Sequence, residues 1–172
     1  MKPKITPTNI EHQLEADDFI VSKTDTKGRI TYCNRIFMKI AGYSEAQLLG
    51  KQHNIIRHPD MPRSVFQMLW DTIESGREFF GYVKNLRRDG GFYWVFANIT
   101  PSYDSGGNLL GYYSVRRKPR GQALKLIAPI YTEMLAVEQK AGAKGAIKAS
   151  GQLLQQKLDA TRKSYEHFVL EI

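Results

Sequence analysis

The pattern of apolar and polar residues begins with two strand-like runs. Residues 19–25 and 29–33 are rich in apolar and β-branched residues and are separated by a short turn that contains Gly28, which predicts a β-hairpin. The polar segment before them, to about Asp17, is predicted to form a helical lead.

Three helical segments are predicted after this hairpin. Asn34 can cap the first, which Gly42 can end. Its apolar residues recur at helical spacing: Ile36, Phe37, Ile40 and Ala41. Ser44 followed by Gln47 repeats the capping pattern. Pro62 can open the third helix. The apolar face of that helix comprises Val65, Phe66, Leu69, Trp70 and Ile73.

The period changes to two in the second half of the chain. Residues 79–87, 92–102 and 109–117 are predicted to be long strands, joined by glycine-containing turns at 89–91 and 104–107. Two strands, several short helices and three antiparallel strands predict an α+β domain with helices on one face of one sheet. A cavity between the sheet and the helices is the expected place for a ligand.

The last third of the chain predicts further helices. Three apolar stripes recur at helical spacing: Leu124, Ile127, Tyr131 and Met134; Leu153, Leu154 and Leu158; and Tyr165, Phe168, Val169 and Ile172. Pro129 is expected to start or kink the first of these helices, and Ser164 can cap the last. These stripes are expected either to pack on the outer face of the chain's own sheet or to couple a ligand site to a partner.

Composition narrows the class of protein. The chain has 172 residues, 42% of them hydrophobic and 24% charged, which is typical of a soluble globular protein. A single cysteine, Cys33, excludes an intrachain disulfide framework and fits a reducing cytoplasm. No secretory signal and no apolar run of membrane-spanning length is present. The net charge of +8 is expected to be solvated surface rather than a nucleic-acid site.

The densest cluster of functional groups lies in the irregular segment 50–62. It comprises His53, Asn54, Arg57, His58 and Asp60. An arginine offers a forked donor to a phosphate, and a carboxylate can orient it or accept from a ribose hydroxyl. The cluster predicts a ligand-binding loop; the alternative is a local Arg57–Asp60 ion pair that holds a turn. No metal-ligand spacing, nucleophile elbow or phosphate-binding glycine fingerprint is present, so neither a metal site nor an enzyme is expected.

A second candidate lies in the strand at 79–87. Alternation places Val83 and Asn85 on one face, and a buried amide needs partners, either a ligand heterocycle or a neighbouring backbone. Several aromatic residues of the same sheet are expected in the core, where some could also stack on a ring: Phe79, Phe80, Trp94, Phe96 and Tyr113.

The runs HNIIRHPDMP and, after a helix, GYVKNLRRDGGFYWV resemble the N-terminal PAS domain of bacterial aerotaxis receptors. The likeness covers about residues 18–118 and includes the late GYYSVR. It implies a PAS fold, with five antiparallel strands and short helices on one face, and a bound FAD that senses redox or oxygen status. Arg57, His58 and Asp60 match the family's flavin-site motif, and Asn34 and Asn85 match positions of its pocket. The predicted cofactor-binding set is Asn34, His53, Asn54, Arg57, His58, Asp60, Phe79, Asn85, Trp94 and Tyr113.

The chain also departs from this family. Phe79 stands where a Trp is common, so packing over the flavin is expected to differ. In related light-sensing flavin PAS domains the photoreactive Cys falls at His53, so no covalent light adduct is expected. The receptors continue into a membrane anchor and a kinase-control region. We therefore expect a stand-alone sensor with a cap at 1–17, a PAS domain at 18–118 and a helical extension at 119–172, read by a chemoreceptor or kinase and possible as a homodimer.

Three alternatives stay open. The chain could be a haem-binding PAS gas sensor with His53 or His58 as axial ligand, although helix 62–75 contains no His. It could be a ligand-free PAS interaction module. It could be a small flavin reductase, for which no nicotinamide fingerprint is present. In the flavin hypothesis, reduction changes hydrogen bonding at the ring edge and moves Asn85 and the sheet.

Overall fold

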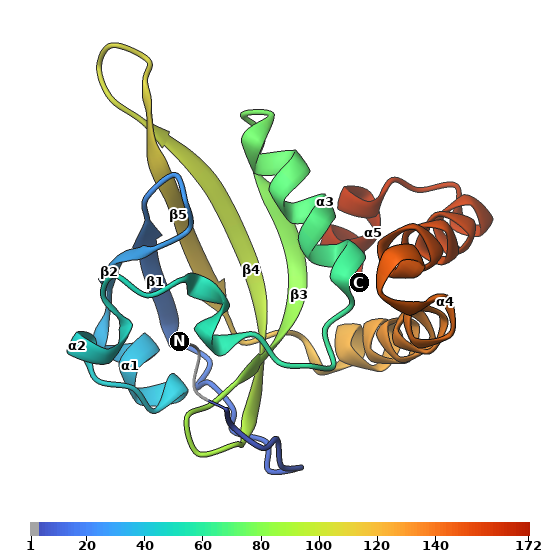
Figure 1. Cartoon of the computed structure of the whole chain (residues 1–172), viewed down its shortest axis with the longest axis horizontal. Helices are drawn as coiled ribbons and strands as arrows, with labels where there is room; N and C mark the ends of the chain where they lie inside the picture. Colours follow the sequence, from blue (N-terminus) through green and yellow to red (C-terminus); the bar gives the residue numbers. More distant parts are fainter. Residues whose placement is uncertain (1–3) are drawn as a thin grey trace.

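A five-stranded antiparallel sheet in the order β2-β1-β5-β4-β3 organises the computed structural model, which describes residues 4–172 (Figure 1). The strands are β1 (Phe19–Thr24), β2 (Ile30–Cys33), β3 (Phe79–Leu86), β4 (Phe92–Tyr103) and β5 (Leu109–Arg117). The predicted α+β class and all five strands are confirmed. Because β5 pairs with both β1 and β4, the first hairpin and the last three strands form one surface.

Two short helices follow β2 where the capping residues predicted them. In α1 (Arg35–Ala41) the Oδ1 of Asn34 accepts the N–H of Phe37 at 3.0 Å. Gly42 ends this helix with a φ of 75°, which L side chains rarely adopt. Helix α2 (Glu45–Leu48) begins with the predicted capping box of Ser44 and Gln47.

The segment between α2 and β3 covers the inner face of the sheet. It contains a short 3₁₀ helix, η1 (His53–Ile56), and then α3 (Arg63–Glu74), which begins after Pro62 as predicted. Val65, Leu69 and Ile73 of α3 are buried toward the sheet. The segment predicted to be irregular, residues 50–62, therefore contains one helical turn, η1, and leads directly into α3.

The predicted N-terminal helix is wrong. Residues 4–17 form an extended arm along the turn between β3 and β4. The N–H of Thr8 donates to the carbonyl of Gly90 at 2.8 Å, and Glu11 forms a parallel bridge with Phe92. The segment has no apolar stripe to bury as a helix, whereas its backbone groups find partners on the strand turn.

The helical extension consists of α4 (Gly121–Thr161) and α5 (Tyr165–Glu171). The helix begins at Gly121 and helical dihedrals continue through Pro129, so Pro129 does not start it; buried Ile127 and Tyr131 lie on either side of the proline. The break lies instead at Gly142, with φ 68° and ψ 176°, a region open essentially to glycine. Among residues 4–172, no helix combines the length and the apolar content that crossing a membrane requires.

The extension packs on the chain's own domain, at the β3 edge and along α3. The Oη of Tyr131 donates to the carbonyl of Tyr82 at 2.9 Å, and the ring of Tyr131 stacks on Trp94. The second half of α4 runs back along α3, and α5, capped by Ser164 as predicted, lies against β3 (Figure 1). The apolar stripes are thus buried within the chain, over the edge and α3 as well as the outer face of the sheet.

Candidate ligand-binding cavity

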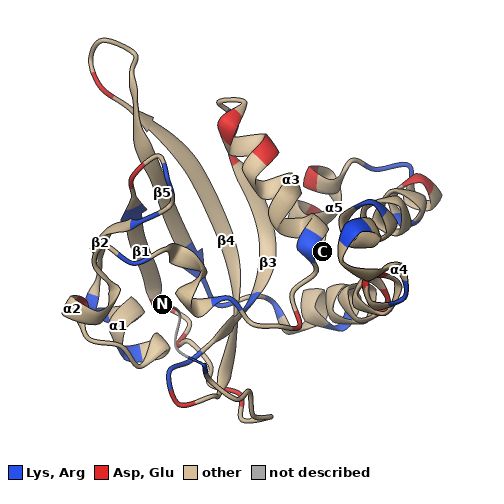
Figure 2. Cartoon of the chain, in the orientation of Figure 1, with Lys and Arg blue, Asp and Glu red and all other residues tan. Residues whose placement is uncertain are grey.

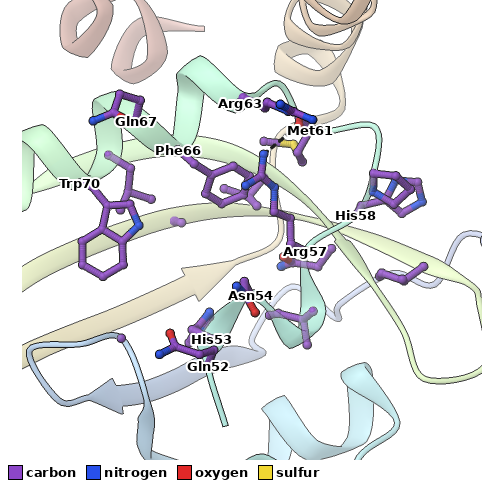
Figure 3. A pocket seen from close by; sticks show the side chains of 18 of the residues that line it. Gln52, His53, Asn54, Arg57, His58, Met61, Arg63, Phe66, Gln67 and Trp70 are labelled. Carbon is purple, nitrogen blue, oxygen red and sulfur yellow. Dashed lines mark hydrogen bonds between the residues drawn. The ribbon is translucent and has the colours of Figure 1, made fainter. Parts of the chain in front are cut away.

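A cavity of about 1270 Å³ lies between the inner face of the sheet and α3 and continues to α4. Its walls come from η1 and the loop after it, α3, the three long strands and α4 (Figure 3). Apolar side chains form much of the surface, among them Ile56, Phe66, Leu69, Trp70, Ile73, Ile99 and Tyr112. An apolar cavity with a few polar groups is the usual form of a small-molecule site.

Arg116 of β5 is a buried cation at the deep end of this cavity. Its side chain is 3% exposed, and its guanidinium lies 4.4 Å from the ring centre of Phe37. Nη2 donates to the Oγ of Ser22 at 2.7 Å, but Nε and Nη1 find no acceptor among residues 4–172. Burial lowers the pKa of Arg116 to about 10. An unpaired buried charge costs several kcal/mol, so this end of the cavity favours a ligand that brings acceptors or negative charge.

His53 lies beside Arg116 and is held neutral. Its ring stacks on Phe37 with centroids 5.8 Å apart, and its Nε2 lies 3.2 Å from the Oγ of Ser22. Burial, and then the charge of Arg116, lower the pKa of His53 to about 3. Because Ser22 accepts from Arg116, its own hydrogen can go to Nε2. The chain Arg116–Ser22–His53 therefore ties β5, β1 and η1 together at the cavity wall.

Arg57 and Asn85 lie next to each other in the wall of the cavity. The two residues form an antiparallel backbone bridge, and the buried Asn85 is on the cavity side with Val83, as alternation predicted. The guanidinium of Arg57 lies 4.0 Å from the ring centre of Phe66 (Figure 3). The pKa of Arg57 is lowered, mainly by burial, and the charge of Glu138 offsets part of this effect. Arg57 is thus a positive group on the path between the deep end and α4.

The remaining loop residues separate into two groups. Asn54 and the buried His58 line the cavity. The Nδ1 of His58 accepts the N–H of Asp60 at 3.1 Å. The carboxylate of Asp60, however, is exposed and pairs with Lys84 at 2.7 Å. Asp60 therefore lies outside the cavity, and its partner is Lys84 rather than Arg57.

Asn34 also lies away from the cavity. Its Oδ1 accepts the N–H of Val21 at 3.1 Å as well as that of Phe37, and its Nδ2 donates to the carbonyl of Phe19 at 2.7 Å. All three bonds hold the start of α1 against β1. The side chain is occupied as a cap, which is the role that its position before a helix predicts.

Three predicted aromatic residues take other places in the fold. Phe79 stacks on Tyr165 of α5 with centroids 5.8 Å apart. Trp94 is covered by α4, and Tyr113 lies on the outer face of the sheet below the ammonium of Lys23. None of the three lines the cavity.

Sequence reasoning missed Arg116, Ser114 and Tyr112 of β5, and Glu138 of α4. In β5 the apolar residues Leu109, Tyr113 and Val115 suggest that their face of the strand is the buried one. The inner face is instead the one that carries Ser114 and Arg116, because it borders a cavity rather than a dry core. An arginine at an inward strand position was the available signal. Glu138 carried no such signal, since its place depends on how α4 folds back.

Comparisons with known proteins agree with this geometry. A family model described as PAS fold matches residues 30–116. The aerotaxis receptor of Escherichia coli (strain K12) is 36% identical over 134 residues, which are 78% of this chain and 26% of that protein. The nitrogen fixation regulatory protein of Klebsiella pneumoniae is 35% identical over 104 residues, 60% of this chain and 21% of that protein. The chain spans about a quarter of the length of these relatives.

Solved structures show the same fold. "The light state structure of the blue-light photoreceptor Aureochrome1 LOV" is 25% identical with a TM-score of 0.57 and covers 64% of this chain and 88% of that one. A structure described as "Flavin Analogue Sheds Light on Light-Oxygen-Voltage Domain Mechanism" is 23% identical with a TM-score of 0.57 and covers 63% and 82%.

Proposed function

Because the chain belongs to the PAS-fold family, we propose that it is a sensor module that binds a flavin nucleotide, FAD, and reports redox or oxygen status to a signalling partner. The observation that carries the proposal is Arg116, a buried cation with two unsatisfied donors inside a large apolar cavity. The similarity to an aerotaxis receptor supports the sensing role, and the light-oxygen-voltage domain studied with a flavin analogue supports the ligand class.

The residues present fit a flavin. A flavin ring is flat, with an apolar body and one edge of alternating hydrogen-bond acceptors and donors. Trp70 and Tyr112 lie edge to face at 5.7 Å and offer apolar ring surface. The guanidinium of Arg116 and the amide of Asn85 offer polar groups to the ring edge. The cavity also exceeds the roughly 300 to 1000 Å³ usual for a drug-sized ligand, which suits a dinucleotide.

The chain's own contacts would carry a change at this site into the sheet. When bound, a flavin supplies a redox centre whose polar edge alters its hydrogen bonding on reduction. Arg116 donates to Ser22, and Ser22 contacts His53. A change in the hydrogen bonds of Arg116 would therefore alter contacts in β5, β1 and η1. Signalling by such a network needs only a different stability of its two arrangements with the two redox states. In this function Arg116, Ser22 and His53 bind the flavin edge and report its state.

Absorption spectroscopy of the purified protein tests this function. We expect a flavin spectrum, either as purified or after addition of FAD and removal of the excess. Arg57→Ala and Asn85→Ala should each lower flavin affinity about tenfold, because a hydrogen bond to a charged or buried partner contributes about 1 to 3 kcal/mol. A Soret band, or no retention of any flavin by the folded protein, would overturn the proposal.

A further inference from the structure

The cavity has a second end that lies outside the PAS domain, in a groove between the start of α3 and α4. Its wall on the α4 side comprises Leu135, Glu138, Gln139, Ala143, Ala146 and Ile147. Arg63 and Gln67 of α3 form the opposite wall. We call this region the outer groove. Since it is continuous with the deep end that holds Arg116, one extended ligand can occupy both.

We propose that the outer groove binds the adenosine half of a flavin dinucleotide, so that α4 makes this chain select FAD over FMN. The inference rests on the proposed flavin-binding function and adds a subsite supplied by the helical extension.

Glu138 fixes the groove by joining α4 to α3. Its Oε1 accepts the N–H of Arg63 at 2.7 Å and that of Ser64 at 3.4 Å, and it lies 2.6 Å from the Oγ of Ser150. The Oγ of Ser150 is also 2.7 Å from that of Ser64. Glu138, Ser64 and Ser150 are all buried, so α4 is packed firmly against the start of α3. A preformed groove spares a ligand the cost of ordering its walls.

The positive charges lie at the boundary between the two ends. Arg57 reaches from the loop toward Phe66, and Arg63 lies at the first turn of α3 (Figure 3). Because the first amides of α3 are already satisfied by Glu138, phosphate oxygens would be bound by the two guanidinium groups rather than by the helix end. The α4 helix carries five lysines and three acidic residues (Figure 2), but none of the five lysines lines the cavity, so the two arginines are the cations available there. If the flavin ring occupies the deep end, the diphosphate of FAD would lie beside Arg57 and Arg63, between that end and the outer groove.

Beyond the arginines the groove is small-sided and apolar. Ala143 and Ala146 leave room for a flat ring, and Ile147 offers an apolar surface that is 43% exposed. Gln139 presents an amide, which can pair with both a donor and an acceptor of an adenine edge. A mononucleotide would end at the arginines and leave these residues uncovered. The break at Gly142 matters here, since it sets Ala143 and Ile147 opposite α3.

Flavin titration of matched α4 variants tests the subsite. The 172-residue chain, freed of bound flavin, is titrated with FAD and with FMN, and affinity is read from the quenching of flavin fluorescence. Ala143→Phe fills the groove, and we expect FAD affinity to fall at least tenfold while FMN affinity stays within twofold. Ala141→Phe, the same change two residues away at an exposed position that does not line the cavity, is the control and should alter neither affinity.

Gln139→Ala gives a second reading that does not depend on tolerance of a bulky side chain. It should weaken FAD several-fold and leave FMN unchanged, with an unaltered thermal unfolding midpoint. Equal affinities of the wild-type chain for FAD and FMN, or equal losses of both ligands in Ala143→Phe and Gln139→Ala, would overturn the subsite while leaving flavin binding intact. Binding of neither flavin by the wild-type chain would remove the proposed function and the subsite together.

Discussion

The two ends of the cavity differ in how their charges are treated. At the deep end, Arg116 is enclosed by the sheet and has no carboxylate beside it among the described residues. In the outer groove, the carboxylate of Glu138 lies among Arg57, Arg63 and the first amides of α3. The deep end thus holds a cation without a carboxylate, whereas in the outer groove the single carboxylate of Glu138 lies beside two arginines and is itself balanced within the protein.

This difference separates binding from architecture. A charge that the protein does not balance is stabilised only when a ligand arrives, so the deep end gains most from occupancy. A charge that the protein balances holds two helices in place with or without a ligand. The deep end should therefore respond to substitution mainly in ligand affinity, and the Glu138 contact mainly in folding stability.

Replacement of Arg116 should give the largest effect, and it should change folding stability and flavin affinity in opposite directions. We expect Arg116→Met to raise the free energy of unfolding of the ligand-free protein by about 1 to 3 kcal/mol, because a buried unpaired charge is removed. Flavin affinity should fall at least tenfold, since a charge-assisted hydrogen bond contributes about 1.5 to 3 kcal/mol. Urea unfolding and flavin titration measure the two changes. A loss of ligand-free stability would instead show that the contacts of Arg116 with Ser22 and Phe37 outweigh the cost of burying its charge.

Removal of the Glu138 carboxylate should lower mainly the folding stability. Glu138→Ala leaves the first amides of α3 and the Ser64–Ser150 pair without their shared acceptor, so we expect a loss of about 2 kcal/mol in urea unfolding. Glu138→Gln keeps an acceptor oxygen and should lose less than about 1 kcal/mol. If the two variants are equally unstable, the contact acts through charge rather than through capping.

The neutral state of His53 predicts a pH dependence. Its folded-state pKa of about 3 lies below the ordinary 6.5, so the unfolded chain binds more protons between these values. Stability from this residue is complete above pH 6.5 and is lost as pH falls toward 3, by about 1 kcal/mol between pH 7 and pH 5.5. His53→Gln should remove that part of the slope in urea unfolding at the two pH values. An unchanged slope would mean that folding does not shift the pKa of His53.

Tyr113 should give the smallest effect, because it lies on the other face of the sheet. Tyr113→Ser removes a ring below Lys23 and should cost about 0.5 kcal/mol of stability, with flavin affinity unchanged. The measurement is a flavin titration beside Asn85→Ala. A loss of affinity comparable to that of Asn85→Ala would show that the outer face controls the cavity.

Local signals predicted most of the fold. Asn34, Ser44 and Ser164 each start a helix where a side-chain oxygen can satisfy a free amide, and that requirement is visible in a few neighbouring residues. The three long strands likewise follow from period-two patterning and their glycine turns. The errors lie where tertiary contacts decide: the extended N-terminal arm, the start of α4 at Gly121 rather than at Pro129, and the break at Gly142.

The cavity was predicted less well than the fold. His53, Asn54, Arg57, His58 and Asn85 line it, whereas the resemblance and strand alternation also pointed to residues that the fold uses elsewhere. Alternation shows that two faces exist but does not show which one surrounds a cavity. A residue from the distant α4 helix could not be assigned from its neighbours at all.

The Glu138 contact also has a consequence for the order of folding. The acceptor of the first amides of α3 lies 75 residues further along the chain. A locally capped helix such as α1 can be completed as soon as its own residues are available, but the first turn of α3 is completed only after α4 has formed and docked. The groove between α3 and α4 can therefore form only after all five strands of the sheet and the first part of α4 have been synthesised.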